Sequence, residues 1–495
     1  MVDVKQKAEN TKITPRETDF SQWYLDIVRE ADLAENSPVR GCMVIKPCGY
    51  AIWEKIQSVL DKEFKKLGTQ NAYFPLLIPK SFLEKEAEHV EGFAKECAVV
   101  THHRLEEKDG KLVPAGELEE PFIIRPTSET IMYDSFSRWI HSYRDLPLLI
   151  NQWCNIMRWE MRPRLLLRTS EFLWQEGHTA HATKEEANEK TLEMLEVYRK
   201  FFEEYLAISP IVGKKTDTEK FPGADYTATI EAMMQDGKAL QAGTSHMLGQ
   251  NFSKSFNVSF LDENQVKQYV WQTSWGVSTR ILGALVIAHS DDRGFIVPPK
   301  MAQYQVVIIP IWTTDEEKKA VFAEIEKVKS ELENIDVTYK VDDREGRPGF
   351  KYFEWERKGV PLRIEIGPKD IQKNSVVIVD RLQSKKEFVP NEKRASYVKV
   401  VLENIQKTLL GNSKRFREEN TREVSSYKEF KETIKNKKGF VYTHLCKDNK
   451  CAETIKEDTS ATARCIPMNG GEDNKGKCIC CNKDTDRKVI FATSY

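Results

Sequence analysis

The sequence predicts a mixed α/β (α+β) protein built from about three domains. Its 495 residues exceed what one hydrophobic core can organise. Segments with helical and with strand-like hydrophobic spacing alternate as far as Val297. After Pro298-Pro299, the spacing predicts the element order βαβαβ. Six of the ten cysteines lie in the last fifty residues, which indicates a separate small module.

These changes of pattern set the predicted boundaries. The polar residues 1–14 predict a flexible N-terminal tail, and residues 15–297 form the first domain. Residues 298–405 predict an α/β domain with helices on a mainly parallel or mixed sheet. Residues 406–495 end the chain, starting with a charged helical connector that runs to about Lys438.

Hydrophobic spacing predicts the individual elements. In the first domain, apolar residues at helical spacing predict helices over 51–68, 128–147 and 184–207, and a short strand between prolines over 71–79. In the second domain, the pattern predicts strands over 304–312, 337–343, 360–367 and 374–381, with helices over 315–334 and 348–359.

The bulk composition excludes several classes of protein. Net charge is -1, which argues against a sequence-indifferent DNA binder. No apolar run reaches the roughly 18 residues of a membrane span, and residues 1–20 lack the apolar segment of a signal peptide. We therefore expect a cytoplasmic protein with no membrane partner.

The stretch CNIMRWEMRPRLLLRTSEFLWQEGHT, residues 154–179, carries unusual charge for a hairpin. The strand pattern places Arg158 and Glu160 on one face, with Arg168 and Phe172 sharing a face of the returning strand. Guanidinium groups bind phosphates through paired hydrogen bonds, and an aromatic ring stacks on a base. The residues of this hairpin therefore indicate a nucleotide site. A surface hairpin with salt bridges fits the spacing equally well.

Three further stretches carry polar residues at telling places. Arg280 opens a helix, where the helix dipole disfavours a cation unless an anion lies nearby. Thr244 and His246 share a face of the glycine-bounded segment 242–257. In RPTSET, Thr127 and Glu129 follow a proline at a helix start, where Ser128 also fits as a cap. Taken singly, each stretch has an ordinary structural explanation.

Together, these stretches resemble the class II aminoacyl-tRNA synthetases. The strings RPTSE, RTSEFLWQEGHTAH, QAGTSH, TSWGVSTR and GVPLRIEIGPKD resemble prolyl-tRNA synthetases of the eukaryotic and archaeal type, from about Pro15 to the chain end. KLGTQNAYFPLLIP looks like the first class II motif, which builds a dimer interface. The resemblance implies a catalytic domain with an antiparallel sheet flanked by helices, an α/β anticodon-binding domain and a zinc-binding-like C-terminal module.

The resemblance also implies the reaction. ATP and L-proline would form prolyl-adenylate and pyrophosphate, and the prolyl group would pass to the 3′-terminal ribose of tRNA(Pro). Mg²⁺ would assist, no side-chain nucleophile is needed, and the enzyme would act as a homodimer. Only ordinary catalytic-domain segments fill the gap between the second and third motifs, so we expect no cis-editing insertion.

The family pattern assigns pocket residues in this sequence. Arg158 would hold the α-phosphate, Arg168 and Arg280 the β- and γ-phosphates, and Phe172 the adenine, with Arg158 and Arg280 as the catalytic residues. The ATP-binding set is Arg158, Glu160, Arg168, Phe172, Gln241, Thr244, Ser278 and Arg280. The proline-binding set is Thr127, Glu129, Arg158, Trp174, Glu176 and His246. Ser278 stands where the family usually has threonine.

Two further regions complete the expectations. Cys446, Cys451, Cys478 and Cys480 would hold structural Zn²⁺, with Cys481 an extra thiol able to compete with Cys480 and unliganded thiols the alternative. The anticodon-binding domain would present basic residues to RNA phosphates; they are Lys351, Arg357, Arg363 and Lys369.

Two alternatives stay open. A non-catalytic paralogue would keep the fold as a tRNA-binding or regulatory module, but would be expected to lose one of the arginines 158, 168 and 280, which are all present. The H-x-x-H pair His178 and His181 would fit a metal hydrolase only with a third ligand, and the sequence offers no obvious one.

Overall fold

The computed structural model describes residues 12–85, 96–468 and 475–495. The first eleven residues of the predicted tail lie outside this range. Its end is not loose, because Ile13 is buried and the Thr14 amide donates to Asp26 Oδ2 at 2.9 Å. The packed chain therefore begins before the predicted boundary at Pro15.

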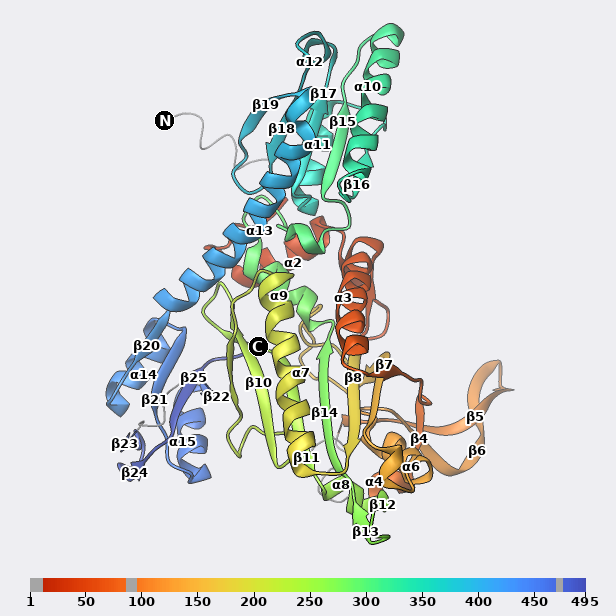
Figure 1. Ribbon diagram of the computed structural model, residues 1–495, viewed down its shortest axis with the longest axis vertical. Coiled ribbons are helices and arrows are strands. Elements are labelled where there is room, and N and C mark those ends of the chain that lie inside the picture. Colours follow the sequence, from red (N-terminus) through yellow and green to blue (C-terminus); the bar gives the residue numbers. More distant parts are fainter. Residues whose placement is uncertain (1–11, 86–95, 469–474) are drawn as a thin grey trace.

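A mainly antiparallel sheet forms the middle of the first domain (Figure 1). Its edge strand β3 pairs with β7 in parallel, and the other neighbours are antiparallel. The strands in spatial order are β9 (Ile211–Lys214), β10 (Tyr226–Met233), β11 (Ala239–Gly249), β14 (Trp271–Ser278), β8 (Glu171–His181), β7 (Leu148–Met157) and β3 (Gln70–Asn71). The predicted antiparallel sheet is confirmed.

Long helices cover one face of this sheet. Helix α7 (Lys184–Glu204) begins with a Thr183 capping box and buries Tyr198, whose hydroxyl bonds Gln175 of β8 at 2.5 Å. Phe64 of α3 (Pro47–Lys66) packs edge-on against the same tyrosine ring. The remaining helices of the domain are α2 (Phe20–Glu30), α4 (Lys80–Glu84), α6 (Glu129–Trp139), α8 (Asn251–Ser255), α9 (Arg280–His289), and the 3₁₀ turns η3 (Tyr143–Asp145) and η4 (Pro299–Met301).

Two predicted elements differ in extent. The helix expected over 128–147 ends at Trp139, before η3 and Pro147. The strand expected over 71–79 is split between β3 and β4 (Leu77–Pro79), which belong to different sheets. Prolines 75 and 79 bound the second piece, and a residue without an amide hydrogen cannot extend a ladder.

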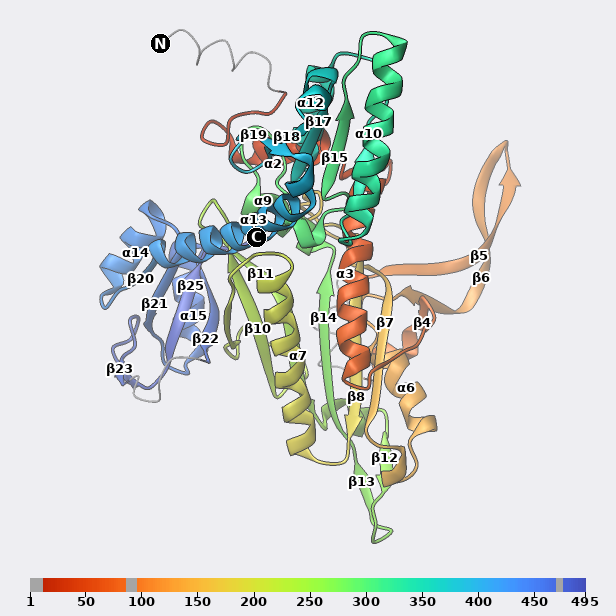
Figure 2. The same ribbon diagram turned by 45° about the horizontal axis from the view of Figure 1, so that its top comes forward.

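A long hairpin, which the sequence did not predict, projects from the first domain (Figure 2). It pairs β5 (Ala98–Lys108) with β6 (Lys111–Ile124), and β4 extends its base. The smaller strand pairs are β1 (Ala34–Asn36) with β2 (Met43–Ile45), and β12 (Ser259–Leu261) with β13 (Lys267–Tyr269).

The second domain contains the predicted mixed sheet. Strand β15 lies parallel to both β16 and β17, while β18 and then the edge strand β19 follow β17 in antiparallel pairing. The elements are β15 (Val306–Pro310), α10 (Asp315–Glu333), β16 (Tyr339–Val341), α11 (Pro348–Lys358), β17 (Leu362–Ile366), α12 (Pro368–Gln372), β18 (Ser375–Asp380), β19 (Lys386–Pro390) and η5 (Asn391–Lys393). A pair between Arg381 and Asp291, at 2.7 Å, links this domain to the first.

The basic residues predicted to face RNA differ in exposure. Lys351 is buried, and its Nζ donates to the Asp342 carbonyl at 3.0 Å, so the prediction is wrong for this side chain. Arg357 faces Glu30 of the first domain, with Nε and Oε2 3.4 Å apart. Lys369 is exposed, as predicted.

The third domain continues the central sheet. Its strand β22 pairs with β9 of the first domain, which extends that sheet to eleven strands. Helix α13 crosses the predicted boundary at 405/406. Only part of the predicted connector links the domains, because Phe430 of α14 is buried in the core of the third domain. The elements are α13 (Arg394–Glu419), β20 (Thr421–Glu423), α14 (Tyr427–Asn436), β21 (Phe440–His444), α15 (Asn449–Thr459), β22 (Thr462–Pro467), β23 (Gly476–Lys477), β24 (Asp484–Thr485) and β25 (Lys488–Ala492). Among the described residues, no helix has the length and apolarity needed to cross a membrane.

Candidate active site

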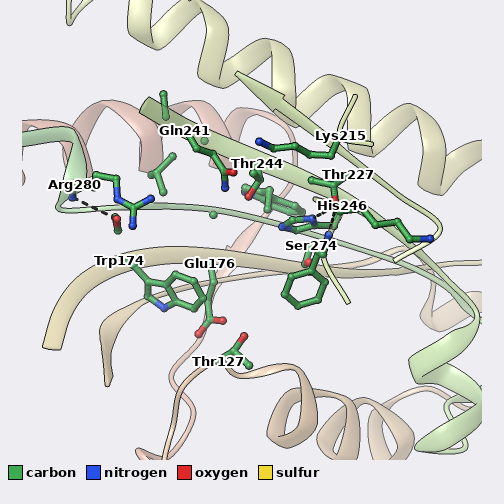
Figure 3. A pocket seen from close by; sticks show the side chains of 18 of the residues that line it. Thr127, Trp174, Glu176, Lys215, Thr227, Gln241, Thr244, His246, Ser274 and Arg280 are labelled. Carbon is green, nitrogen blue, oxygen red and sulfur yellow. Dashed lines mark hydrogen bonds between the residues drawn. The ribbon is translucent and has the colours of Figure 1, made fainter. Parts of the chain in front are cut away.

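A cavity of about 310 Å³ opens on the central sheet, a size typical of small-molecule sites (Figure 3). Strands β8, β11 and β14 and the loop before α6 supply most of its wall. Eleven of the predicted site residues line it: Thr127, Glu129, Arg158, Phe172, Trp174, Glu176, Gln241, Thr244, His246, Ser278 and Arg280. The other two, Glu160 and Arg168, line an adjoining cavity that shares Arg158, Phe172, Ser278 and Arg280 with the first.

The charged hairpin differs in detail from the strand pairing that its sequence suggests. Strand β7 ends at Met157, so Arg158 and Glu160 lie in the connecting loop, and Arg168 precedes β8. Arg158 and Arg168 do not lie on paired strands. The two sides of the loop are joined by a side-chain contact, in which Arg168 Nε donates to Glu160 Oε2 at 3.0 Å. The predicted shared strand face of Arg158 and Glu160 is therefore wrong, although both side chains border the connected cavities.

Three arginines concentrate positive charge at one end of the site. Burial, together with the neighbouring charges of Arg158 and Arg168, lowers the pKa of Arg280 to about 10. The Arg158 guanidinium lies 5.4 Å from the ring centre of Trp174 and 5.7 Å from that of Phe172. Guanidinium groups hold phosphate oxygens through paired hydrogen bonds, so three of them beside connected cavities suit a phosphate chain.

The hairpin tip is held by the helix that carries Arg280. Two of its leucines, Leu166 and Leu167, are buried. Arg280 Nε donates to the Leu167 carbonyl at 3.0 Å. A side chain at Gly283 would come within 2.5 Å of Leu167, so the close approach of helix and tip requires glycine there.

Two buried carboxylates define the other end of the site. Glu129 accepts a hydrogen bond from Thr127, and Glu176 accepts bonds from Ser128 and from Gln152 Nε2, the latter at 2.9 Å. Both glutamates are less than 4% exposed. Carboxylates that line a cavity offer acceptor oxygens and negative charge to a ligand, so this end suits a cationic ligand group.

Histidine 178 lines the cavity beside Glu176. Its ring bonds Glu176 Oε2 at 3.1 Å and the Tyr133 hydroxyl at 3.0 Å. Burial by itself would lower the pKa of His178, but the bond to Glu176 and the charge of Glu129 raise it above its usual value. His181 contacts Thr179 instead, so the H-x-x-H pair does not converge on one metal site.

The third wall comes from β11 and the loop before β10. The Thr227 hydroxyl bonds His246 Nδ1 at 2.9 Å, and the Phe221 ring lies 4.6 Å from the imidazole, centre to centre. Burial lowers the pKa of His246 to about 4, so this imidazole is neutral at neutral pH. Sequence reasoning missed Lys215, Phe221 and Thr227 in this wall, and Ser274 of the neighbouring strand β14; the local signal is the Pro-Gly turn at 222–223.

The cysteine cluster differs from prediction in one member. The four sulfurs that lie within 4.8 Å of one another belong to Cys446, Cys451, Cys478 and Cys481, so Cys481 takes the place predicted for Cys480. Cys446 Sγ lies 3.6 Å from the sulfurs of Cys451 and Cys481. Four thiolates around tetrahedral Zn²⁺ lie about 3.8 Å apart, so the cluster fits this ion.

We expect the two adjacent cysteines to differ in metal binding. Cys481→Ser should reduce the zinc bound per chain, because it removes one of the four converging thiolates, whereas Cys480→Ser should retain it. Metal analysis of the purified variants, together with the charge-transfer absorption of their Co²⁺ forms, measures the number of thiolate ligands. The opposite ranking would restore Cys480 as the ligand.

Three families match successive parts of the chain. Residues 113–289 match the class II tRNA synthetase core domain (G, H, P, S and T), residues 305–401 an anticodon-binding domain, and residues 427–495 the prolyl-tRNA synthetase C-terminal domain. Each stretch falls inside one of the three predicted domains.

Curated relatives match over nearly the whole length. Proline--tRNA ligase of Amoebophilus asiaticus is 52% identical over 489 residues, and those of Porphyromonas gingivalis and Bacteroides fragilis are 53% identical over 492 and 491 residues. Each alignment covers 98% of this chain and 99% of the relative. With this identity and coverage, the chain belongs to the proline–tRNA ligase family of class II aminoacyl-tRNA synthetases.

Proposed function

We propose that this protein attaches L-proline to tRNA(Pro) in two steps that use ATP. The single observation that carries the proposal is the cavity with Arg168 and Arg280 at one end, two buried carboxylates at the other and Arg158 bordering both. One end suits the triphosphate of ATP, and the other suits the secondary ammonium of proline. The space between them is where a carboxylate and an α-phosphate would meet.

The first step requires positioning rather than a nucleophilic side chain. Arg158 borders both cavities, so its guanidinium is placed to hold the α-phosphate and the proline carboxylate together. The carboxylate oxygen attacks the α-phosphorus, the bond to the bridging oxygen breaks, and pyrophosphate leaves. Arg168 and Arg280 stabilise the charge that the leaving group gains, and Phe172 stacks on adenine.

The proline end selects a small cationic ring. Glu129 and Glu176 face the ammonium, and Trp174 offers an apolar face to the pyrrolidine methylenes. The neutral His246 contributes no competing positive charge. In the second step the tRNA 3′-terminal ribose hydroxyl attacks the acyl carbon, and AMP leaves.

Mg²⁺ would neutralise phosphate charge in the first step. This ion takes one or two carboxylates and otherwise keeps phosphate and water ligands. Glu96 and Glu160 border the arginine-lined cavity, so carboxylates are present for it. Zn²⁺ would act as a structural ion on the cysteine cluster.

Binding of tRNA is assigned to the second domain. Phe350 and Phe353 of α11 are both 64% exposed, and exposed aromatic rings offer stacking surfaces for unpaired bases. We further propose a cytoplasmic homodimer without a cis-editing insertion. Tyr73 and Leu77, in the segment that resembles the first class II motif, are 73% and 40% exposed and are candidates for the dimer contact.

ATP–pyrophosphate exchange over a panel of amino acids tests the proposal. Exchange should depend on proline and exceed that with every other amino acid. Stronger exchange with another amino acid would overturn the substrate assignment. Absence of exchange in folded protein would favour the non-catalytic paralogue.

The chain end is expected to support this activity. Tyr495 packs on the first domain, where its hydroxyl bonds Asp236 at 2.7 Å and its ring lies 5.1 Å from the Arg164 guanidinium of the hairpin tip. Deleting Ser494–Tyr495 removes this support from the loop that carries Arg168, so proline-dependent exchange should fall about tenfold. Steady-state exchange kinetics measure the loss, and unchanged kinetics would exclude the role.

A further inference from the structure

A buried group of three charged residues adjoins the cavity and includes a residue of the third domain. Lys215 Nζ contacts Glu231 Oε1 at 2.7 Å, and the Arg464 Nε and Nη2 atoms each lie 3.0 Å from Glu231 Oε2. Lys215 and Arg464 are each 6% exposed, and Glu231 is fully buried. Each carboxylate oxygen therefore has its own cationic partner.

The charge group lies on the cavity side of the sheet. Lys215 lines the cavity, and Figure 3 shows it beside Thr227 and Thr244. Its amide donates to the Thr227 carbonyl at 2.8 Å, and its side chain contacts Glu231, which lies four residues further along β10. Glu231 pairs across the strands with Gln241, so the lysine ammonium lies at the level of the proposed ATP-binding residues.

Arg464 reaches this place because the third domain extends the sheet. Strand β22 pairs with β9, with Ile466 opposite Lys214. The Arg464 Nη1 atom also donates to the Thr462 hydroxyl at 2.9 Å, which fixes the guanidinium to its own strand. Burial would raise the pKa of Glu231, but the charges of Lys215 and Arg464 lower it, so the carboxylate is ionised.

We propose that Arg464 of the third domain is a positioning residue for the nucleotide end of the active site. By occupying one oxygen of Glu231, it fixes the carboxylate so that Lys215 is held along the cavity wall beside Gln241 and Thr244. Without Arg464, the carboxylate is free to turn toward Lys215 with both oxygens, and the lysine ammonium shifts from its place. The inference rests on the proposed function, because it assigns the cavity wall that contains Lys215 to ATP.

Exchange kinetics of Arg464→Met in the full-length protein test the proposal. The KM for ATP should rise on the order of tenfold, while the KM for proline changes by less than about twofold, because the carboxylate end lies on other elements. Lys215→Met should likewise raise the KM for ATP and leave the KM for proline nearly unchanged. The double variant should be no worse than Lys215→Met alone, because both changes act through one ammonium group. Arg464→Lys should recover part of the loss, since it restores one contact but not the fork.

Arg422→Met is the matched control. Arg422 belongs to the same domain and donates to the Asn420 and Lys438 carbonyls, remote from Glu231, so its KM values should equal those of the wild type. An unchanged KM for ATP in folded Arg464→Met would overturn the proposal, as would equal changes in both KM values or additive effects in the double variant. Wild-type protein without proline-dependent exchange would instead overturn the proposed function.

Discussion

Arg158→Ala should abolish proline-dependent ATP–pyrophosphate exchange. The guanidinium borders both cavities, and its Nε donates to the Pro126 carbonyl at 2.7 Å, which orients it between the two ends of the site. The variant loses the group that would hold both reacting partners. We expect the exchange rate to fall by at least about 10³-fold, which is the upper end of the range for removing one hydrogen-bond donor that stabilises a transition state. Exchange assays at saturating ATP and proline measure it.

Two further variants separate charge from geometry. Arg158→Lys keeps the positive charge but not the planar fork, so it should recover only a small part of the activity. Arg162→Ala removes an exposed arginine from the same loop and should leave exchange unchanged. Substantial activity in Arg158→Ala, with a wild-type melting temperature, would remove Arg158 from the proposed mechanism.

Glu129→Gln should raise the KM for proline far more than the KM for ATP. The substitution keeps the shape and one acceptor oxygen, but replaces a buried cavity-lining carboxylate, which would face the proline ammonium, with a neutral amide. Loss of one partner from a buried charge pair costs about 2–5 kcal/mol, which corresponds to roughly 30-fold to several thousand-fold in affinity. Proline titrations in the exchange assay measure the change.

Asp134→Asn provides the control for this variant. Asp134 belongs to the same helix, α6, but pairs with Arg138 on its outer side, so neither KM should change. If Glu129→Gln retains the wild-type KM for proline, Glu176 alone meets the ammonium. If both KM values rise together, Glu129 supports the fold of the site rather than proline binding.

The predicted pocket residues lie together in the structure because the stretches that carry them are long and chemically specific. RPTSE, RTSEFLWQEGHTAH and QAGTSH each place several polar residues at fixed spacing, and their strand or helix context carries them to one cavity. Eleven of the thirteen predicted pocket residues line the main cavity, and the adjoining cavity holds Glu160 and Arg168.

Predictions that depended on local periodicity alone were less accurate. The hairpin loop looks strand-like because Trp159 and Met161 alternate with charged residues, yet the chain leaves the ladder at Met157 and pairs Arg168 with Glu160. The sequence pattern places Lys351 on the surface of an amphipathic helix, but its side chain is buried and donates to the Asp342 carbonyl. Periodicity describes one element, whereas burial depends on which other elements pack against it.

By itself, the sequence determined the domain order, the antiparallel sheet and the chemistry of the pocket, because these depend on residue type and short-range spacing. Only the tertiary structure decided which distant residues share a wall. Nothing in the spacing of β9 and β22 indicates that they pair, yet this pairing brings Arg464 to Glu231 across 233 positions of the chain. The choice of Cys481 over Cys480 likewise depends on the direction of two neighbouring side chains, which backbone geometry sets and composition does not.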